Sequence, residues 1–187
     1  MLTIRDDFFP SFDIVREWAD NALYDEYRSP VDGVIYPGIN ADIPDWIRAH
    51  TQAELQAITG SPREIKHIFT RLSLEGNKAP HQAHTDSTMG GYSLMVYLNR
   101  PQDCRGGTSI VRHRETGMYS NPKDAIEEYV WKRDTNRPQA WEIIDICWME
   151  PNRACIFPAE LMHRAEPVGG FGKDAKHGRL VLTAFFT

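Results

Sequence analysis

Residues 64–75, EIKHIFTRLSLE, show the pattern that decides the fold, an alternation of side chains with a period of two. On an extended chain, successive side chains point to opposite faces. One face therefore carries Ile68, Thr70, Leu72 and Leu74, and the other carries His67, Phe69, Arg71 and Ser73. This pattern indicates a strand with one face in a core, and it predicts that the sheet begins near residue 64.

Further strands are predicted along the chain after this one. They are YSLMVYLN (92–99), GGTSIVRH (106–113), WEIIDICWME (141–150), RACIFP (153–158) and GRLVLTAFFT (178–187). A polar insert at residues 115–140 interrupts them, with a helix expected after Pro122. The length of this insert suggests a lid over a site, a segment packed on the sheet, or a dimer contact.

Residues 1–63 read as helical. One helix is predicted after Ser11, a Pro-Gly turn in VIYPGIN (34–40), and a second helix from the capping box TQAE (51–54) to Gly60. Short strands after a helical start favour an α+β fold with an antiparallel sandwich or barrel. We expect one domain over residues 1–187, with helical support at 1–63 and the sheet core at 64–187.

The composition is that of an ordinary globular protein, with 187 residues of which 41% are hydrophobic and 25% charged. A net charge of −5 argues against nonspecific nucleic-acid binding, which needs a cationic face. Three cysteines without CxxC spacing, Cys104, Cys147 and Cys155, disfavour a disulfide framework. Neither a signal peptide nor an apolar run of roughly 18 residues is present, so we expect a cytoplasmic protein without a membrane partner.

Two histidines and an aspartate fall within six positions in HQAHTD (81–86). His84 and Asp86 are two residues apart, so an extended chain turns both side chains the same way. A third candidate ligand is His163, which follows the strand RACIFP. Two imidazoles and one carboxylate leave three coordination positions open, as in non-haem Fe(II) oxygenases. The H-E-x-x-H of many zinc hydrolases is absent, and a cupin would normally show His-x-His.

An oxygenase of this kind that uses 2-oxoglutarate needs a cation for the far carboxylate of that cosubstrate. A guanidinium suits this role because its fork donates two parallel hydrogen bonds. Arg179 opens the final predicted strand and shares one face with Val181 and Thr183. The alternative is an arginine at a strand edge that faces water.

With these motifs in order, residues 65–187 resemble the double-stranded β-helix (jelly roll) of the 2-oxoglutarate/Fe(II)-dependent dioxygenases, most closely the prolyl-4-hydroxylase-like branch. The motifs are HTD (84–86), GYSLMVYLN (91–99), GGTSIV (106–111), NRACIFPAELMHRAEPV (152–168) and GRLVLTAFF (178–186). The resemblance implies that His84, Asp86 and His163 bind Fe(II). It also implies that Arg179, with Tyr97 and Thr183, binds 2-oxoglutarate.

The sequence departs from the family at the basic residue, which usually follows the second histidine by about ten positions. Lys173 has that spacing, whereas Arg179 lies sixteen residues after His163. We predict Arg179, because Lys173 lies in GGFGKDAKHG (169–178), which reads as a flexible loop. The nucleic-acid demethylases of the superfamily carry a second arginine where this chain has Phe185, which further disfavours a nucleic-acid substrate.

The implied reaction consumes O2 and 2-oxoglutarate, releases succinate and CO2, and hydroxylates a C–H bond. The substrate stays open between a protein or peptide residue and a small molecule. Two alternative functions are a non-catalytic β-helix protein that binds a ligand or metal, and a cupin-like metal enzyme that needs no 2-oxoglutarate.

Overall fold

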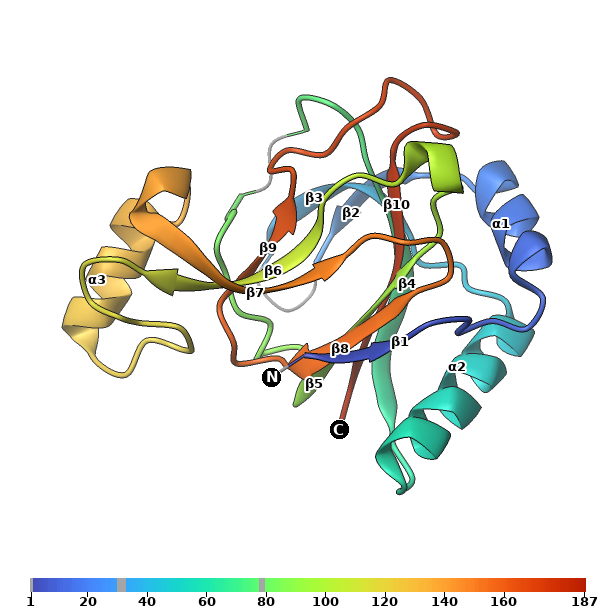
Figure 1. Ribbon diagram of the computed structural model, residues 1–187, viewed down its shortest axis with the longest axis horizontal. Helices are drawn as coiled ribbons and strands as arrows, with labels where there is room; N and C mark the ends of the chain where they lie inside the picture. The colour runs from blue at the N-terminus through green and yellow to red at the C-terminus, as the bar shows by residue number, and fades with distance from the viewer. Residues whose placement is uncertain (1, 30–32, 78–79) are drawn as a thin grey trace.

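The computed structural model describes residues 2–29, 33–77 and 80–187, which form a mixed α/β fold with antiparallel sheets (Figure 1). The helices are α1 (Phe12–Asn21), α2 (Asp45–Thr59) and α3 (Ala125–Asp134), with short 3-10 turns at Pro101–Asp103 and Pro138–Ala140. The strands are β1 (Thr3–Arg5), β2 (Asp25–Arg28), β3 (Ile35–Asn40), β4 (Ile65–Ser73), β5 (Tyr92–Tyr97), β6 (Gly107–His113), β7 (Trp141–Trp148), β8 (Ala154–Pro158), β9 (His163–Glu166) and β10 (Arg179–Phe186). Among the described residues, none of the helices has both the length and the apolar composition needed to cross a bilayer.

The larger sheet has seven strands in the order β1-β8-β5-β10-β4-β3-β2. β10 lies in its centre and pairs antiparallel with β4 and β5, so that Val181 lies between Arg71 and Tyr97. All eight residues of β10 are buried. A strand that is covered on both faces is expected to be apolar throughout, which explains the unbroken run LVLTAFF.

The smaller sheet has three strands in the order β7-β6-β9 and packs against the larger one. Ile110 and Cys147 of the smaller sheet join Tyr97, Cys155 and Val181 of the larger sheet in one buried cluster. The inner face of the larger sheet therefore faces the smaller sheet, and every second residue of β4, β5 and β10 points into the space between them.

The opposite face of the larger sheet is covered by α1 and α2. Val15 of α1 and Ile47 of α2 belong to the same buried cluster as Leu94 and Leu182 of the sheet. Truncating such a fully buried leucine to alanine typically costs about 2–5 kcal/mol of stability. In Figure 1, α1 and α2 lie at one end of the molecule and α3 lies at the other.

The first 63 residues differ from the prediction, because they contribute β1, β2 and β3 as well as two helices. VIYPGIN was expected to form a turn, but Ile35–Asn40 is strand β3, which pairs with β4. Gly38 has a φ of 70°, and a Cβ at this position would collide with the backbone carbonyl of Leu72. Gly38 is therefore needed for the close approach of β3 and β4. A Pro-Gly pair is also typical of turns, which is why the sequence predicted a turn here.

The predicted start of the second helix is also wrong. Thr51 does not cap the helix but lies inside α2, where its hydroxyl donates to the carbonyl of Ile47 at 2.8 Å. Inside a helix, a threonine hydroxyl can donate to the carbonyl of the residue four positions earlier. The TQAE pattern alone therefore does not define a helix start. The predicted end is confirmed, since Gly60 ends α2 in the left-handed conformation.

The predicted helices after Ser11 and Pro122 are confirmed as α1 and α3. Ser11 precedes α1 without a side-chain capping bond. At α3, the Asp124 side chain accepts hydrogen bonds from the backbone N–H groups of Ile126 and Glu127.

Candidate metal and cosubstrate site

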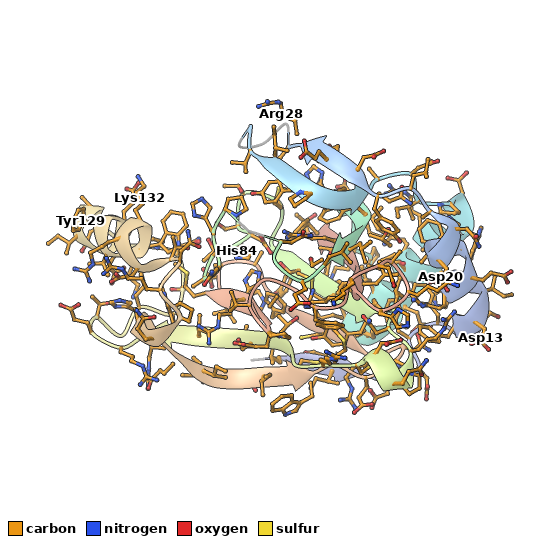
Figure 2. The ribbon with its side chains drawn as sticks, turned by 90° about the horizontal axis from the view of Figure 1, so that it is seen from above. Asp13, Asp20, Arg28, His84, Tyr129 and Lys132 are labelled. Carbon is orange, nitrogen blue, oxygen red and sulfur yellow. The ribbon has the colours of Figure 1, made fainter. Side chains whose placement is uncertain are left out.

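The three predicted metal ligands come together in the structure. His84 Nε2 lies 3.6 Å from Asp86 Oδ1, and His163 Nε2 lies 3.1 Å from Asp86 Oδ2. One ligand atom from each residue lies within 4.8 Å of the other two. Figure 2 shows His84 in the middle of the molecule, between α3 and the larger sheet.

Backbone hydrogen bonds fix the spacing of these side chains. His84 and His163 form an isolated antiparallel bridge, with N–H to O distances of 3.1 and 2.9 Å in the two directions. The N–H of Asp86 donates to the carbonyl of Ala159 at 2.8 Å. The loop that follows β4 is thus joined on both sides of Thr85 to the segment between β8 and β9. Because the chain is extended at residues 84–86, the His-x-Asp spacing turns both side chains to the same side.

Each histidine is held in the tautomer that a metal ligand needs. His84 Nδ1 lies 3.0 Å from the carbonyl of Gln82, and His163 Nδ1 lies 3.0 Å from the carbonyl of Leu161. A carbonyl only accepts, so the ring proton of each neutral histidine lies on Nδ1. Each Nε2 is thus the ring nitrogen that faces the site, and at His163 its lone pair becomes available to a metal ion once the proton that it donates to Asp86 is lost. Backbone partners of this kind orient the imidazoles of metal sites.

The three groups also shift each other's pKa values. Burial and the neighbouring His163 lower the pKa of His84 to about 4, so His84 is neutral at physiological pH. Burial acts to raise the pKa of Asp86, but the charge and hydrogen bond of His163 lower it to about 2. Burial likewise acts to lower the pKa of His163, but Asp86 raises it above the ordinary value. Asp86 is therefore an anion with two imidazole nitrogens beside it, which is a donor set suited to a divalent cation.

A cavity of about 540 Å³ opens at these three residues and reaches into the space between the sheets. Arg179 lines it and is buried, with an exposed fraction of 6%. Its Nη2 donates to the carbonyl of Gly107 at 3.2 Å and to Thr108 Oγ1 at 3.4 Å, whereas its Nε is buried without a hydrogen-bond partner. No ion pair to Arg179 is present within the described ranges. Burying an uncompensated guanidinium is costly, so this position favours an anionic ligand.

The other residues predicted to hold the cosubstrate have different positions. Thr183 lines the cavity, and its hydroxyl lies 3.4 Å from Met95 Sδ. Tyr97 is fully buried behind the lining, with its hydroxyl donating to Thr108 Oγ1 at 2.9 Å or to the carbonyl of Cys147 at 3.1 Å. The guanidinium of Arg179 lies 5.9 Å from the centre of the Tyr97 ring. Tyr97 thus contacts the arginine and Thr108, and it does not line the cavity.

Lys173, the alternative basic residue, is exposed in the loop before β10 and does not line the cavity. The sequence analysis missed two polar residues that do line it, Thr108 and Arg71. The signal for Arg71 was present in the alternation of residues 64–75, which placed it on the same face as His67 and Phe69.

The insert at residues 115–140 is attached to the loop that carries His84. Both Trp131 Nε1 and Thr135 Oγ1 donate to the carbonyl of Ala83, at 2.8 and 2.7 Å, and the N–H of Ala83 donates back to the carbonyl of Thr135. A bridge between Ser120 and Leu161 ties the insert to the segment before His163 as well. The insert therefore supports both histidine-bearing segments, and Trp131 closes part of the cavity wall.

A second group of potential metal ligands lies where β6 meets the insert and consists of His113, Glu115 and Asp134. His113 Nε2 lies 3.1 Å from Asp134 Oδ2, and the carboxylate of Asp134 also accepts from Arg133 at 2.5 Å and Arg137 at 3.2 Å. The hydrogen bond from Arg133 is the main reason why the pKa of Asp134 is lowered. Because arginines already neutralise this carboxylate, the group is an ion-pair network that anchors the end of α3 against β6.

Comparison with known proteins supports the fold and adds a family. A family described as a family of unknown function (DUF6445) matches residues 1–186. The chain belongs to this family. Among curated proteins, none matches the chain in sequence.

Solved structures with a similar fold include proteins whose titles name alpha ketoglutarate, 2-oxoglutarate or iron. The non-heme alpha ketoglutarate dependent epimerase SnoN from nogalamycin biosynthesis matches with a TM-score of 0.58 and 12% identity, over 100% of this chain and 78% of SnoN. EctD from S. alaskensis with 2-oxoglutarate and 5-hydroxyectoine matches with a TM-score of 0.59 and 14% identity, over 100% and 71%. An oxidoreductase of the 2OG-Fe(II) oxygenase family from Burkholderia pseudomallei matches with a TM-score of 0.55 and 12% identity, over 100% and 84%. The chain therefore has the fold of these enzymes.

Proposed function

We propose that this protein is an Fe(II)- and 2-oxoglutarate-dependent oxygenase that uses O2 to hydroxylate a C–H bond, with release of succinate and CO2. In this proposal residues 1–187 act as one domain, and the two sheets form a double-stranded β-helix supported by α1 and α2. His84, Asp86 and His163 hold the iron, whereas Arg179 and Thr183 hold the far carboxylate of 2-oxoglutarate. Tyr97 lies behind the cavity lining, contacts Arg179 and Thr108 and holds them in position.

The observation that carries the proposal is a buried arginine that has no acidic partner among the described residues and lies in the same cavity as the His–Asp–His group. Arg179 lies at the start of β10, and Thr183 lies further along the same strand on the same face. A dicarboxylate that reaches the metal group with one end would compensate the guanidinium with the other. A single ligand would thus meet the metal group at one end and the buried guanidinium at the other.

Bound iron and 2-oxoglutarate would supply the oxidative chemistry, and the protein side chains would supply geometry and protection. The carbonyls of Gln82 and Leu161 orient the two imidazoles, and the bridge between His84 and His163 fixes their separation. Three ligands leave open positions for cosubstrate and O2. The apolar wall of β10, with Val181 and Phe185, limits water at the site.

We favour a small-molecule substrate over a peptide. The cavity is a bounded space of about 540 Å³, within the range of ligand pockets. The titles of the similar structures name small molecules, nogalamycin RO for SnoN and 5-hydroxyectoine for EctD. The assignment to the prolyl-4-hydroxylase-like branch rests on the motif resemblance alone.

The alternatives are a non-catalytic ligand-binding protein and a cupin-like metal enzyme. A cupin-like enzyme has no use for a buried cation opposite its metal, so the position of Arg179 disfavours it. A non-catalytic protein would bind the metal and 2-oxoglutarate but release no succinate in air. Succinate formation by the anaerobically purified protein, after addition of Fe(II), 2-oxoglutarate and air, therefore separates the oxygenase from both alternatives. Binding of 2-oxoglutarate without succinate formation would then separate the non-catalytic protein from the cupin-like enzyme.

Calorimetric titration of the Mn(II)-loaded protein with 2-oxoglutarate, under anaerobic conditions, tests the binding mode. Removing the partner of a buried carboxylate costs about 2–5 kcal/mol, so Arg179→Ala should raise the dissociation constant about thirtyfold or more. Arg179→Lys should recover part of this loss, because lysine keeps the charge without the fork. Lys173→Ala, the matched control, should change the constant less than about threefold. A large loss for Lys173→Ala with Arg179→Ala near wild type would reverse the assignment.

A further inference from the structure

Arg71 is another cavity arginine for which the described residues supply no acidic partner. It lies on β4 between Val181 of β10 and Ile39 of β3, and its side chain lines the cavity. Its Nε is buried and has no hydrogen-bond partner. The guanidinium lies 5.7 Å from the centre of the Tyr36 ring, and no ion pair of the described residues includes it. Burial lowers the pKa of Arg71, which reflects the cost of keeping this charge out of water.

Arg71 and Arg179 point to different sides of the cavity. Arg179 donates to Gly107 and Thr108 of β6, whereas Arg71 lies against Tyr36 of β3. The bound 2-oxoglutarate of the proposed function has one far carboxylate, which is the partner of Arg179. Arg71 therefore faces a separate part of the cavity, beside the hairpin of β2 and β3.

The charges of the cavity do not balance without a further anion. Among the described lining residues, Asp86 is the single carboxylate, although the whole chain has a net charge of −5. A divalent iron and dianionic 2-oxoglutarate cancel each other, and the single charge of Asp86 balances only one of Arg71 and Arg179. Arg48 also lines the cavity and adds a further positive charge, so positive charge remains unbalanced. Lys66 also lines the cavity, but its ammonium already pairs with Glu64 at 2.7 Å.

We infer that Arg71 binds an anionic group, a carboxylate or a phosphate, on the primary substrate. This inference rests on the proposed function and deepens it by naming the substrate class. The planar guanidinium would take the anion through two parallel hydrogen bonds, with one from the free Nε. Tyr36, His67 and Phe69 line the same region and would contact the rest of a small molecule. The anion would fix the substrate so that one of its C–H bonds faces the metal.

The test uses the protein loaded with Zn(II) and 2-oxoglutarate, which binds both ligands without turnover. Nuclear magnetic resonance of the ¹⁵N-labelled arginine side chains gives one Nε–H signal for Arg71, identified by its loss in Arg71→Gln. Propionate and inorganic phosphate are titrated separately as probes. We expect a saturable shift of the Arg71 signal with one of them, and the probe that binds more tightly distinguishes a carboxylate from a phosphate.

Calorimetry of the same probes supplies the second readout. Arg71→Gln should weaken the binding of the preferred probe at least about tenfold while the dissociation constant of 2-oxoglutarate changes less than about threefold. Lys66→Gln is the matched control, because it removes a cavity cation that already has a partner, and it should leave both constants unchanged.

Two outcomes would overturn the inference. One is a loss of 2-oxoglutarate affinity in Arg71→Gln as large as in Arg179→Gln, which would assign Arg71 to the cosubstrate. The other is a wild-type complex with bound 2-oxoglutarate in which neither probe shifts the Arg71 signal. If the wild type does not bind 2-oxoglutarate, the proposed function fails, and the probe titration of the Zn(II) form still decides whether Arg71 is an anion site.

Discussion

Two groups of histidine and carboxylate side chains in this protein look alike in composition and differ in what surrounds them. His84 and His163 have backbone carbonyls on their Nδ1 atoms, so each Nε2 is the ring nitrogen that faces Asp86 and can bind a cation once it is deprotonated. In the other group, the Nδ1 of His113 accepts from the N–H of Thr116, so Nε2 carries the proton and donates to Asp134. One imidazole arrangement offers lone pairs to a cation, and the other has used its proton to satisfy a carboxylate.

The charges around the two carboxylates separate the groups further. Asp134 accepts from Arg133 and Arg137, whereas within the described residues Asp86 has imidazole and hydroxyl partners and no arginine. A metal ion at Asp134 would have to displace two guanidiniums. A cluster of ligand-type side chains can therefore serve as a metal site only where no arginine or lysine already neutralises its carboxylate.

The largest expected effect concerns metal affinity. Asp86→Asn and His163→Ala should each weaken Mn(II) binding by more than about 100-fold, since the loss of mere outer-sphere partners already costs about 10–100-fold. Asp134→Asn, the matched change in the second group, should leave the affinity within about threefold. Isothermal titration with Mn(II) measures each variant. Equal losses at Asp86 and Asp134 would break the distinction between the two groups.

His81 offers a stricter control within the same loop. It lies three residues before His84, lines the cavity and packs against Trp131 with the rings tilted and their centres 5.1 Å apart. Since His84, Asp86 and His163 already form a complete set, His81→Ala should cost much less Mn(II) affinity than His84→Ala. The reverse order would mean that the proposed register of the ligands is wrong.

The second expected effect concerns stability, and here the larger effect is expected at Asp134 instead of Asp86. Asp134 is buried and accepts hydrogen bonds from charged partners, so Asp134→Asn should lower the free energy of unfolding by about 1–3 kcal/mol at pH 7. The pKa of Asp134 is lowered in the folded state, so its stabilising contribution is present above pH 4 and disappears as the pH falls through the folded value. The difference between wild type and variant should therefore shrink in acid.

Urea unfolding at pH 7 and at low pH measures this difference. Glu142→Gln is the control, because its ion pair with Arg112 is exposed and should contribute less than about 1 kcal/mol. A cost that stays constant with pH would show that the packing of Asp134, and not its charge, stabilises the insert.

The smallest expected effect links the two groups through α3. Thr135 follows Asp134 directly, and its hydroxyl holds the carbonyl of Ala83 beside His84. Thr135→Val removes one hydrogen bond of about 1 kcal/mol, and Trp131 still donates to the same carbonyl, so Mn(II) affinity should fall about fivefold or less. Thr116→Val removes a hydroxyl elsewhere in the insert and should leave Mn(II) affinity unchanged. Equal affinity in both variants would reduce the insert to a structural element without influence on the ligands.

The features that could be predicted from the sequence are those that depend on residues close together along the chain. The period-two alternation of residues 64–75 predicted β4 and its two faces, because a strand needs no distant residue to define its pleat. Similar alternation and apolar runs predicted the later strands, and a glycine predicted the end of α2. The His-x-Asp spacing likewise predicted that His84 and Asp86 would lie together.

The tertiary structure decided everything that depends on which distant groups meet. VIYPGIN became a strand because Gly38 allows contact with Leu72 of β4, and Thr51 became an interior helix residue. Only the folded chain shows that Arg133 and Arg137 neutralise Asp134 while Arg71 and Arg179 remain without acidic partners. The free energy of a buried charge is set by its neighbours in space, and residues far apart in sequence supply those neighbours.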